Sequence, residues 1–209
     1  MQLTNSCIIV FAKAPRPGTT KTRLIPLLGA DGAAALQARL VEHTLVTAKA
    51  AAVGSVALYG TPAADEFLRT CAERYDVPLV DQCEGDLGQR MHAALDNAFA
   101  QSACVLLIGS DCPALTVRHL RSAERALADG HDAVFVPTED GGYALVGLTR
   151  IHPKLFSDIC WSTSRVMGAT RVRLRELGFN WTELETLWDV DRPADYVRLM
   201  ASGLVAAAG

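Results

Sequence analysis

The sequence predicts an α/β fold built on a largely parallel sheet with helices on both faces. Short apolar runs of strand length alternate with longer amphipathic segments along the 209 residues. The apolar runs are nearly continuous, which is typical of strands that are buried on both sides. Half of the residues are hydrophobic, which excludes a disordered chain. There is no internal repeat and no linker rich in Pro, Gly and Ser, so we expect 1–209 to form a single domain.

The alternation predicts six strands and six helices. The strands are expected at 7–11, 55–59, 77–80, 105–108, 133–136 and 143–148. The helices are expected at 31–51, 63–75, 87–101, 117–129, 163–177 and 194–201. Asp31, Asp86 and Thr116 have the side chains of helix N-caps, while Gly130 and Gly178 mark helix ends.

The loop after the first strand carries four cationic residues, Lys13, Arg16, Lys21 and Arg23, and it is opened by Gly18. A short loop with this charge indicates an anionic ligand, and the polyphosphate of a nucleotide suits it. The loop lacks the spacing of a Walker motif and of a dinucleotide fingerprint. A solvated basic loop is the alternative, but α/β proteins place ligands after their first strand, which favours phosphate binding.

The overall charge excludes some classes of partner. The formal net charge is −3, so the basic loop is a local feature that suits a small anion better than nucleic acid or a membrane surface. No signal peptide is visible, and the first apolar run is too short to span a bilayer. The six cysteines lack zinc or disulfide spacing, which predicts a reduced, cytoplasmic protein. Cys112 could be a nucleophile, but we favour a packing role.

The expected strand at 105–108 ends in Gly109-Ser110-Asp111. A carboxylate at the carboxyl end of a central strand, opposite a phosphate-binding loop, is well placed to bind Mg²⁺ or Mn²⁺. The alternative for Asp111 is structural, as a cap near Thr116 or in an Asx turn before Pro113.

A second acidic segment lies near the C-terminus. Asp189 and Asp191 alternate, so on extended backbone both point to one face, where a metal ion would relieve their repulsion. Alternatively, Asp191 caps the helix that follows, with Pro193 in its first turn. The two interpretations can hold together, one for each Asp.

The acidic turn Asp140-Gly141-Gly142 separates two expected strands. A hairpin turn explains it, and a platform for a second substrate is the functional alternative. Trp161 could belong to the same pocket, although an N-cap at Ser162 with Trp161 as its hydrophobic staple is the simpler interpretation.

Taken together, these segments resemble the GT-A, or nucleotide-diphospho-sugar transferase, superfamily. The resemblance rests on Phe-Ala-Lys-x-Pro-x-x-Gly-x-x-Lys-Thr-Arg-Leu at 11–24 and on the segments at 85–91, 109–113, 139–143, 161–163 and 189–195. Within the superfamily, the chain resembles a bacterial group of GT-A-like glycosyltransferases related to phospholactate guanylyltransferase and the molybdenum-cofactor nucleotidyltransferases. The resemblance implies a Rossmann-like α/β/α sandwich of GT-A type.

The resemblance also implies roles for residues at matching positions. For the nucleotide it implies Lys13, Gly18, Lys21, Arg23, Gly85 and Gly88, for the metal Asp111, Asp189 and Asp191, and for the acceptor Gly141 and Gly142. We also expect Ala12 and Ser110 to bind the nucleotide and Asp140 and Trp161 to bind the acceptor. Lys21 and Asp111 are the expected catalytic residues. The chain lacks the Gly-x-Gly-x-Arg run of sugar nucleotidyltransferases and has Ser-Asp-Cys where many glycosyltransferases have Asp-x-Asp.

These observations predict a Mg²⁺-dependent transferase that takes a nucleotide donor and a small-molecule acceptor. Four loop cations suit a triphosphate, which slightly favours nucleotidyl transfer over glycosyl transfer from a sugar nucleotide. A non-catalytic nucleotide-binding module is a further alternative, because a fold does not fix a function. The missing glycine fingerprint disfavours an oxidoreductase. Apolar helix faces leave room for a homodimer, and no histidine lies in a motif that marks a general base.

Overall fold

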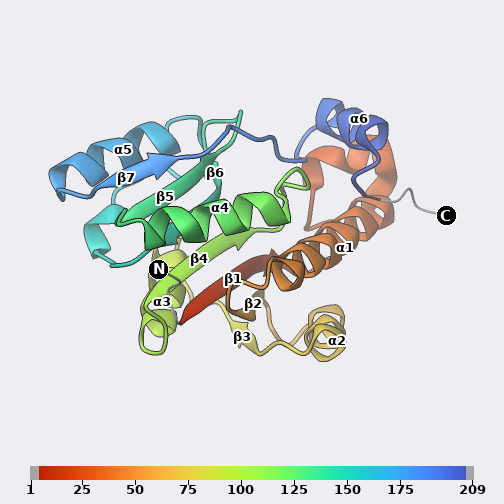
Figure 1. The fold of residues 1–209 in the computed structure, drawn as a ribbon. Coiled ribbons are helices and arrows are strands. Elements are labelled where there is room, and N and C mark those ends of the chain that lie inside the picture. Colours follow the sequence, from red (N-terminus) through yellow and green to blue (C-terminus); the bar gives the residue numbers. More distant parts are fainter. Residues whose placement is uncertain (1–4, 206–209) are drawn as a thin grey trace.

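Seven strands form one sheet in the computed structural model, which describes residues 5–205 (Figure 1). The strands are β1 (Ser6–Lys13), β2 (Ser55–Thr61), β3 (Leu79–Asp81), β4 (Cys104–Gly109), β5 (Ala133–Pro137), β6 (Tyr143–Leu148) and β7 (Trp181–Glu183). They lie in the order β3-β2-β1-β4-β6-β5-β7. Only β6 is antiparallel to its neighbours, β4 and β5, among the strands of this described region. The predicted, largely parallel sheet is therefore confirmed.

Helices cover both faces of this sheet. They are α1 (Ile25–Ala51), α2 (Glu66–Tyr75), α3 (Leu87–Phe99), α4 (Val117–Ala128), α5 (Val166–Glu176) and α6 (Pro193–Ser202). Side chains from α1, α2 and α4 join the core on one face, and side chains from α3 and α5 join the core on the other. Strand β1 shows the alternation that separates the two cores: Ile8 and Val10 point into the first, Ile9 and Phe11 into the second.

A third, smaller core attaches the C-terminal segment to the start of α1. Trp188, Val190 and Leu199 pack there against Leu36 and Leu40. The backbone N–H of Val190 also donates to the Asp111 carbonyl at 2.9 Å, beyond the end of β4. This packing brings the acidic segment around Asp189 and Asp191 beside the first loop, although about 170 residues separate them in the chain.

Most of the predicted helix caps are confirmed. Asp86 and Thr116 are the N-caps of α3 and α4, and Gly130 and Gly178 directly follow the C-caps of α4 and α5. The N-cap predicted at Asp31 is wrong, because α1 starts at Ile25 and continues across a kink at Gly29, where φ is +72°.

Other differences lie at element ends. β7 was missed, and β3 begins at Leu79 rather than at 77. Helix α5 begins at Val166 with Arg165 as its N-cap, so the N-cap predicted at Ser162 is wrong; Ser162 instead lies in a turn with φ of +61°.

Helix α1 with its preceding turn, Thr22–Ala51, is long and apolar enough to cross a membrane by length and composition. The core helix of a globular domain passes the same test. Leu36, Leu40 and Leu45 are fully buried against the rest of the protein. Part of the apolar surface of α1 therefore packs in the core, and 39% of its most apolar 18-residue window is buried.

Candidate active site

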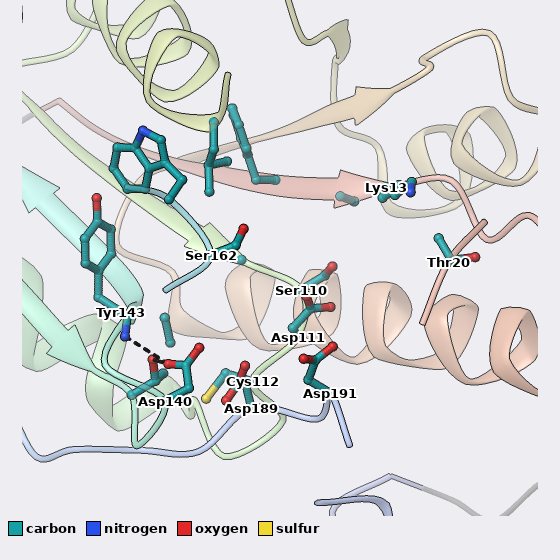
Figure 2. A pocket seen from close by; sticks show the side chains of 18 of the residues that line it. Lys13, Thr20, Ser110, Asp111, Cys112, Asp140, Tyr143, Ser162, Asp189 and Asp191 are labelled. Atoms are coloured by element: carbon teal, nitrogen blue, oxygen red, sulfur yellow. Dashed lines mark hydrogen bonds between the residues drawn. The ribbon is translucent and has the colours of Figure 1, made fainter. Parts of the chain in front are cut away.

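A cavity of about 640 Å³ opens at the carboxyl ends of β1 and β4 (Figure 2). These strands are neighbours, but the chain leaves β1 toward β2 and β3 and only later returns to β4 on the other side of β1. Open α/β sheets bind ligands at such a point. The cavity brings together most of the predicted site residues: Ala12, Lys13, Lys21, Arg23, Ser110, Asp111, Asp140, Gly142, Trp161, Asp189 and Asp191.

The four remaining predicted residues, Gly18, Gly85, Gly88 and Gly141, are not among the lining residues. Gly88 and Gly141 shape the cavity wall indirectly, because each lets another segment approach closely. The predicted direct contacts of all four glycines with a ligand stay predictions.

The first loop is tied to itself and to α2. The Arg16 carbonyl accepts from the backbone N–H and the hydroxyl of both Thr19 and Thr20, and Lys13 Nζ donates to the Thr19 carbonyl at 2.6 Å. The Arg16 side chain pairs with Asp65, the N-cap of α2, at 3.0 Å. The prediction that four cations surround one anion is therefore wrong for Arg16, and three of the four line the cavity.

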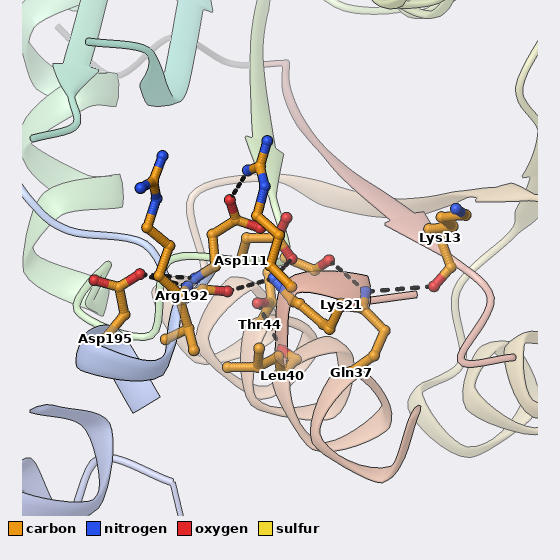
Figure 3. Close-up of polar contacts among 12 residues, drawn as sticks. Lys13, Lys21, Gln37, Leu40, Thr44, Asp111, Arg192 and Asp195 are labelled. Atoms are coloured by element: carbon orange, nitrogen blue, oxygen red, sulfur yellow. Dashed lines mark hydrogen bonds and ion pairs between the residues drawn. The ribbon is translucent and has the colours of Figure 1, made fainter. Parts of the chain in front are cut away.

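Lys21, which lines the cavity, links three parts of the chain (Figure 3). Its Nζ lies 2.7 Å from an Asp111 carboxylate oxygen and donates to the Val190 carbonyl at 2.7 Å. Its side chain is only 5% exposed, whereas that of Asp111 is 55% exposed. Lys21 thus holds a buried positive charge against a carboxylate that faces the cavity. The capping alternative for Asp111 is not supported, because Thr116 is the N-cap of α4, whereas the alternative of an Asx turn before Pro113 stays a prediction.

Arg23 and Asp191, which both line the cavity, form an ion pair. The alternative role of Asp191 as an N-cap is wrong. Arg192 is the N-cap of α6, and the Asp195 carboxylate accepts from the backbone N–H groups of Arg192, at 2.7 Å, and Asp191, at 3.1 Å. Since Asp195 satisfies this turn, the Asp191 carboxylate remains directed toward Arg23 and the cavity.

Carboxylates gather along one edge of the cavity, where Figure 2 shows Asp140, Asp189, Asp191 and Asp111. The pKa of Asp189 is raised to about 6, first by burial, then by the negative charge of Asp140, and to a smaller degree by that of Asp111. Lys21 acts in the opposite direction. A raised pKa is expected of a buried carboxylate that lacks a close cation.

In residues 5–205 no three Asp, Glu, His or Cys side chains converge closely enough to form a ready metal site. Asp111 and Asp191 instead pair with Lys21 and Arg23. The donor set still fits Mg²⁺ or Mn²⁺, because it consists of carboxylate oxygens, which these ions prefer. The assignment of Asp111, Asp189 and Asp191 to a metal stays a prediction.

Gln37 of α1 connects the ends of the two central strands and was not predicted (Figure 3). Its Nε2 donates to the Lys13 carbonyl and to Ser110 Oγ, both at 3.3 Å, and the residue is 3% exposed. A polar residue on the buried face of an amphipathic helix is the sequence signal that could have found it. Gln37 fixes the spacing of Lys13 and Ser110 within the cavity.

The acidic turn joins the antiparallel strands β5 and β6, which confirms the hairpin interpretation, and its residues Asp140 and Gly142 also line the cavity. Asp140 accepts from the Gly142 N–H at 2.9 Å and from the Thr138 hydroxyl at 2.5 Å. A Cβ on Gly141, whose φ is +90°, would lie 2.3 Å from the Ser164 carbonyl oxygen. The turn therefore packs tightly against the segment before α5, and the Asp140 carboxylate is held firmly beside the cavity.

Trp161 packs between this wall and the start of α3. Its ring meets Tyr143 edge to face, with centroids 6.5 Å apart. A Cβ on Gly88 would lie 2.6 Å from Trp161 Nε1 and 2.4 Å from the Phe156 carbonyl oxygen, so Gly88 allows the indole to lie against α3. Trp161 is thus fixed as part of the cavity wall.

Two further lining residues were missed, Gln82 and Arg90. Gln82 Nε2 donates to the carbonyls of Ala12, at 3.3 Å, and Tyr59, at 2.8 Å, while its Oε1 accepts from Arg90 at 3.1 Å. Their contact joins the end of β3 to the second turn of α3, and no motif spacing signals it.

Cys112 also lines the cavity, but it is 4% exposed, and burial raises its pKa to about 12. The thiol is therefore protonated and a poor nucleophile, which supports the packing role.

The family model for an uncharacterized protein conserved in bacteria (DUF2064) matches residues 44–163. A Desulfovibrio desulfuricans protein, described as a candidate nucleotide-diphospho-sugar transferase, is 30% identical in sequence. It superimposes with a TM-score of 0.86 over 95% of this chain and 87% of that one. No curated protein sequence matches the chain.

More distant structures share the fold. The 4-diphosphocytidyl-2C-methyl-D-erythritol synthase of Anaerococcus prevotii is 12% identical, with a TM-score of 0.64 over 95% of both chains. Glucosyl-3-phosphoglycerate synthase from Mycobacterium tuberculosis, in complex with Mn²⁺, UDP and glucosyl-3-phosphoglycerate, is 11% identical, with a TM-score of 0.58 over 96% of this chain and 77% of that one. The fold is therefore that of nucleotidyl- and glycosyltransferases, as expected.

Proposed function

The chain belongs to the bacterial protein family DUF2064, and from this premise we propose that it is a divalent-metal-dependent nucleotidyltransferase that acts on a small-molecule acceptor. Its structural relatives support the general class, a transferase that uses a nucleotide donor. One observation carries the narrower proposal. A basic first loop and a set of carboxylates line one cavity at the ends of β1 and β4, where Lys21 and Arg23 pair with two of the carboxylates.

Each wall of the cavity has a chemical role in this proposal. Lys13 and Arg23 would bind phosphate oxygens by charge-assisted hydrogen bonds. Asp111 and Asp189, with Asp140 beside them, would hold Mg²⁺ or Mn²⁺. When bound, the ion would neutralise phosphate charge. Lys21 supports this arrangement, because its buried ammonium fixes Asp111.

The reaction needs no covalent intermediate with the protein. An acceptor oxygen forms a bond to the α-phosphorus, the bond to the β-phosphate oxygen breaks, and pyrophosphate leaves with the electron pair. Positioning and charge neutralisation supply most of the catalysis of such transfers. The rigid wall around Asp140 and Trp161 suits the acceptor, because it lies across the cavity from the basic loop.

Glycosyl transfer from a sugar nucleotide is the second candidate, and a specific observation favours it. Lys21 and Arg23 are already paired with Asp111 and Asp191, so the loop offers less free positive charge than its sequence indicates. A diphosphate needs less charge than a triphosphate, so this pairing reduces the preference for a nucleoside triphosphate.

A thermal-shift screen separates these candidates. The four nucleoside triphosphates and a set of sugar nucleotides are each added with and without Mg²⁺, because a ligand that binds the native state raises the melting temperature. Nucleotidyl transfer predicts a Mg²⁺-dependent shift with a triphosphate, whereas glycosyl transfer predicts a shift with a sugar nucleotide but not with its triphosphate. A shift that is indifferent to Mg²⁺ would indicate a non-catalytic nucleotide-binding module.

A further inference from the structure

The cations that line the cavity differ in how their charge is compensated. Lys21 and Arg23 each pair with a carboxylate. Arg90 also lines the cavity, but it makes no ion pair with any carboxylate in the described part of the chain. A positive group that faces a cavity without a counter-charge is available to an electron-rich ligand.

Arg90 is held in place rather than free to rotate. Its Nη1 donates to Gln82 Oε1 at 3.1 Å, and its Nε donates to the Asp86 carbonyl at 3.4 Å. Gln82 is itself fixed, since its amide nitrogen donates to the carbonyls of Ala12 and Tyr59. Asp86, in turn, is the N-cap of α3, locked in a capping box with Gln89. A guanidinium oriented in this way loses little freedom when it binds a ligand.

These bonds use two of the five N–H groups of the guanidinium, which leaves Nη2 and one N–H of Nη1 without a partner among residues 5–205. A planar guanidinium presents such groups as parallel donors. Its natural partner is a rigid group with two adjacent acceptors. Arg90 therefore selects by hydrogen-bond pattern as well as by charge.

The surroundings of Arg90 suit a flat ring. Leu87 and Met91 on α3 and Leu107 on β4 line the same cavity, and Met91 and Leu107 are almost fully buried. The chain of contacts from Arg90 through Gln82 reaches Ala12, the residue next to Lys13. Arg90 and Lys13 thus line one cavity and are connected through Gln82, which offers a nucleotide whose phosphates bind at Lys13 a place for its base beside Arg90.

We propose that Arg90, oriented by Gln82, reads the base of the nucleotide donor and selects one with two adjacent hydrogen-bond acceptors, namely guanine or cytosine. Guanine presents O6 beside N7, and cytosine presents O2 beside N3. Adenine places an amino donor next to N7, and uracil places an N–H between its two carbonyls, so both leave a donor facing Arg90. This inference rests on the proposed function, because it assumes that the cavity binds a nucleotide.

The test measures the affinities of GTP, CTP, ATP and UTP in the presence of Mg²⁺ by isothermal titration calorimetry, with inorganic triphosphate as a probe that has no base. The wild-type protein is expected to prefer GTP or CTP over ATP and UTP by about 5- to 100-fold, the range typical of one bidentate pair. Whether GTP or CTP binds more tightly distinguishes the two bases.

The variants Arg90→Gln and Gln82→Ala are expected to reduce this preference to less than about 3-fold, while the affinity for inorganic triphosphate stays unchanged. Arg69→Gln, at an exposed position on α2 outside the cavity, is the matched control and should behave like the wild type. Unchanged affinity of these variants for inorganic triphosphate would show that Arg90 contacts the base and not the phosphates.

Three results would overturn the inference. They are a wild-type preference for ATP or UTP, equal affinity for all four nucleotides, and an equal loss of nucleotide and triphosphate binding in Arg90→Gln. In each of these results the protein still binds nucleotides, so the proposed function survives. If the wild-type protein binds neither nucleotides nor triphosphate, the proposed function fails together with the inference.

Discussion

Lys21 is the residue on which the geometry of the cavity depends most. Its Nζ joins Asp111 at the end of β4 to the Val190 carbonyl in the C-terminal segment, and its side chain is almost completely buried. Its positive charge therefore serves both the fold and the site.

Lys21→Met is expected to leave Asp111 without its cation and the Val190 carbonyl without its side-chain donor. We predict a loss of about 1–3 kcal/mol in the free energy of unfolding, since the buried hydrogen bond to Val190 is lost. The affinity for Mg²⁺-nucleotide should fall at least about tenfold. Chemical denaturation and calorimetry measure the two effects, with Lys49→Met, an exposed lysine on α1, as the control. Unchanged nucleotide affinity in a folded variant would contradict the assignment of Lys21 to the site.

Asp189, unlike Lys21, is a charged group without a close partner of opposite charge. Its pKa is raised to about 6 in the folded protein, against an ordinary value near 3.8, so the folded state disfavours the charged form. The contribution of Asp189 to the free energy of unfolding is therefore fully present below the ordinary pKa, and it is lost as the pH rises to about 6. Two pKa units correspond to at most about 3 kcal/mol.

Without metal, Asp189→Asn is expected to be more stable than the wild type at pH 8 and equal to it near pH 4, because the amide carries no charge. The variant should also lose the stabilisation that Mg²⁺ with nucleotide gives the wild type. Melting temperatures at the two pH values test this prediction, with Asp96→Asn on the exposed side of α3 as the control. A variant that is less stable than the wild type at pH 8 would disprove the account of this carboxylate.

At the scale of elements, the close contact of α3 with Trp161 sets one wall of the cavity. Gly88→Ala places a Cβ 2.4 Å from the Phe156 carbonyl oxygen and 2.6 Å from Trp161 Nε1. A backbone oxygen cannot rotate away, so the wall must shift. We predict a loss of about 1–3 kcal/mol in stability, the usual cost of overpacking.

Gly168→Ala is the matched control for this change, because Gly168 lies in α5 and a Cβ there meets nothing within 4 Å. It should be neutral or stabilise by up to about 1 kcal/mol through helix propensity. Thermal and urea denaturation of both variants compare them directly. If Gly88→Ala is as stable as Gly168→Ala, the close packing of α3 on Trp161 is not a constraint.

The elements that the sequence predicted well are those with local signals. Asp86 forms a capping box with Gln89, and the buried run before Asp111 forms a central strand, so each could be read from neighbouring residues. The strand β7 could not, because its three half-buried residues have no apolar pattern and pair only at the sheet edge. The start of α1 was hidden by Gly29, which normally ends a helix.

The residues of the candidate site also divide into those that local sequence signals place and those that depend on packing between elements. Residues at strand ends, such as Asp111 and Lys13, could be placed because the carboxyl ends of parallel strands meet at one edge. The Gln82–Arg90 contact and the pairing of Arg16 with Asp65 could not be predicted, since both depend on how separate elements pack. Sequence patterns give the positions of charges along the chain, while the structure decides which charges compensate one another.

At the scale of the whole molecule, the central sheet separates two cores, and the cavity lies where β1 and β4 end between them. The C-terminal segment closes this arrangement, because the third core fixes it to α1 and carries Asp189 and Asp191 to the first loop. The basic loop and the carboxylates thus come from opposite ends of the chain, so the site exists only in the complete fold.

The most direct test of this account is a calorimetric titration of the preferred nucleotide, with and without Mg²⁺, into the wild-type protein and Asp111→Asn. We predict tight binding by the wild type only when Mg²⁺ is present, and in the variant a loss of that Mg²⁺ dependence with the fold retained. Nucleotide binding that is equally tight without Mg²⁺ and in Asp111→Asn would contradict a metal-dependent transferase site at the ends of β1 and β4.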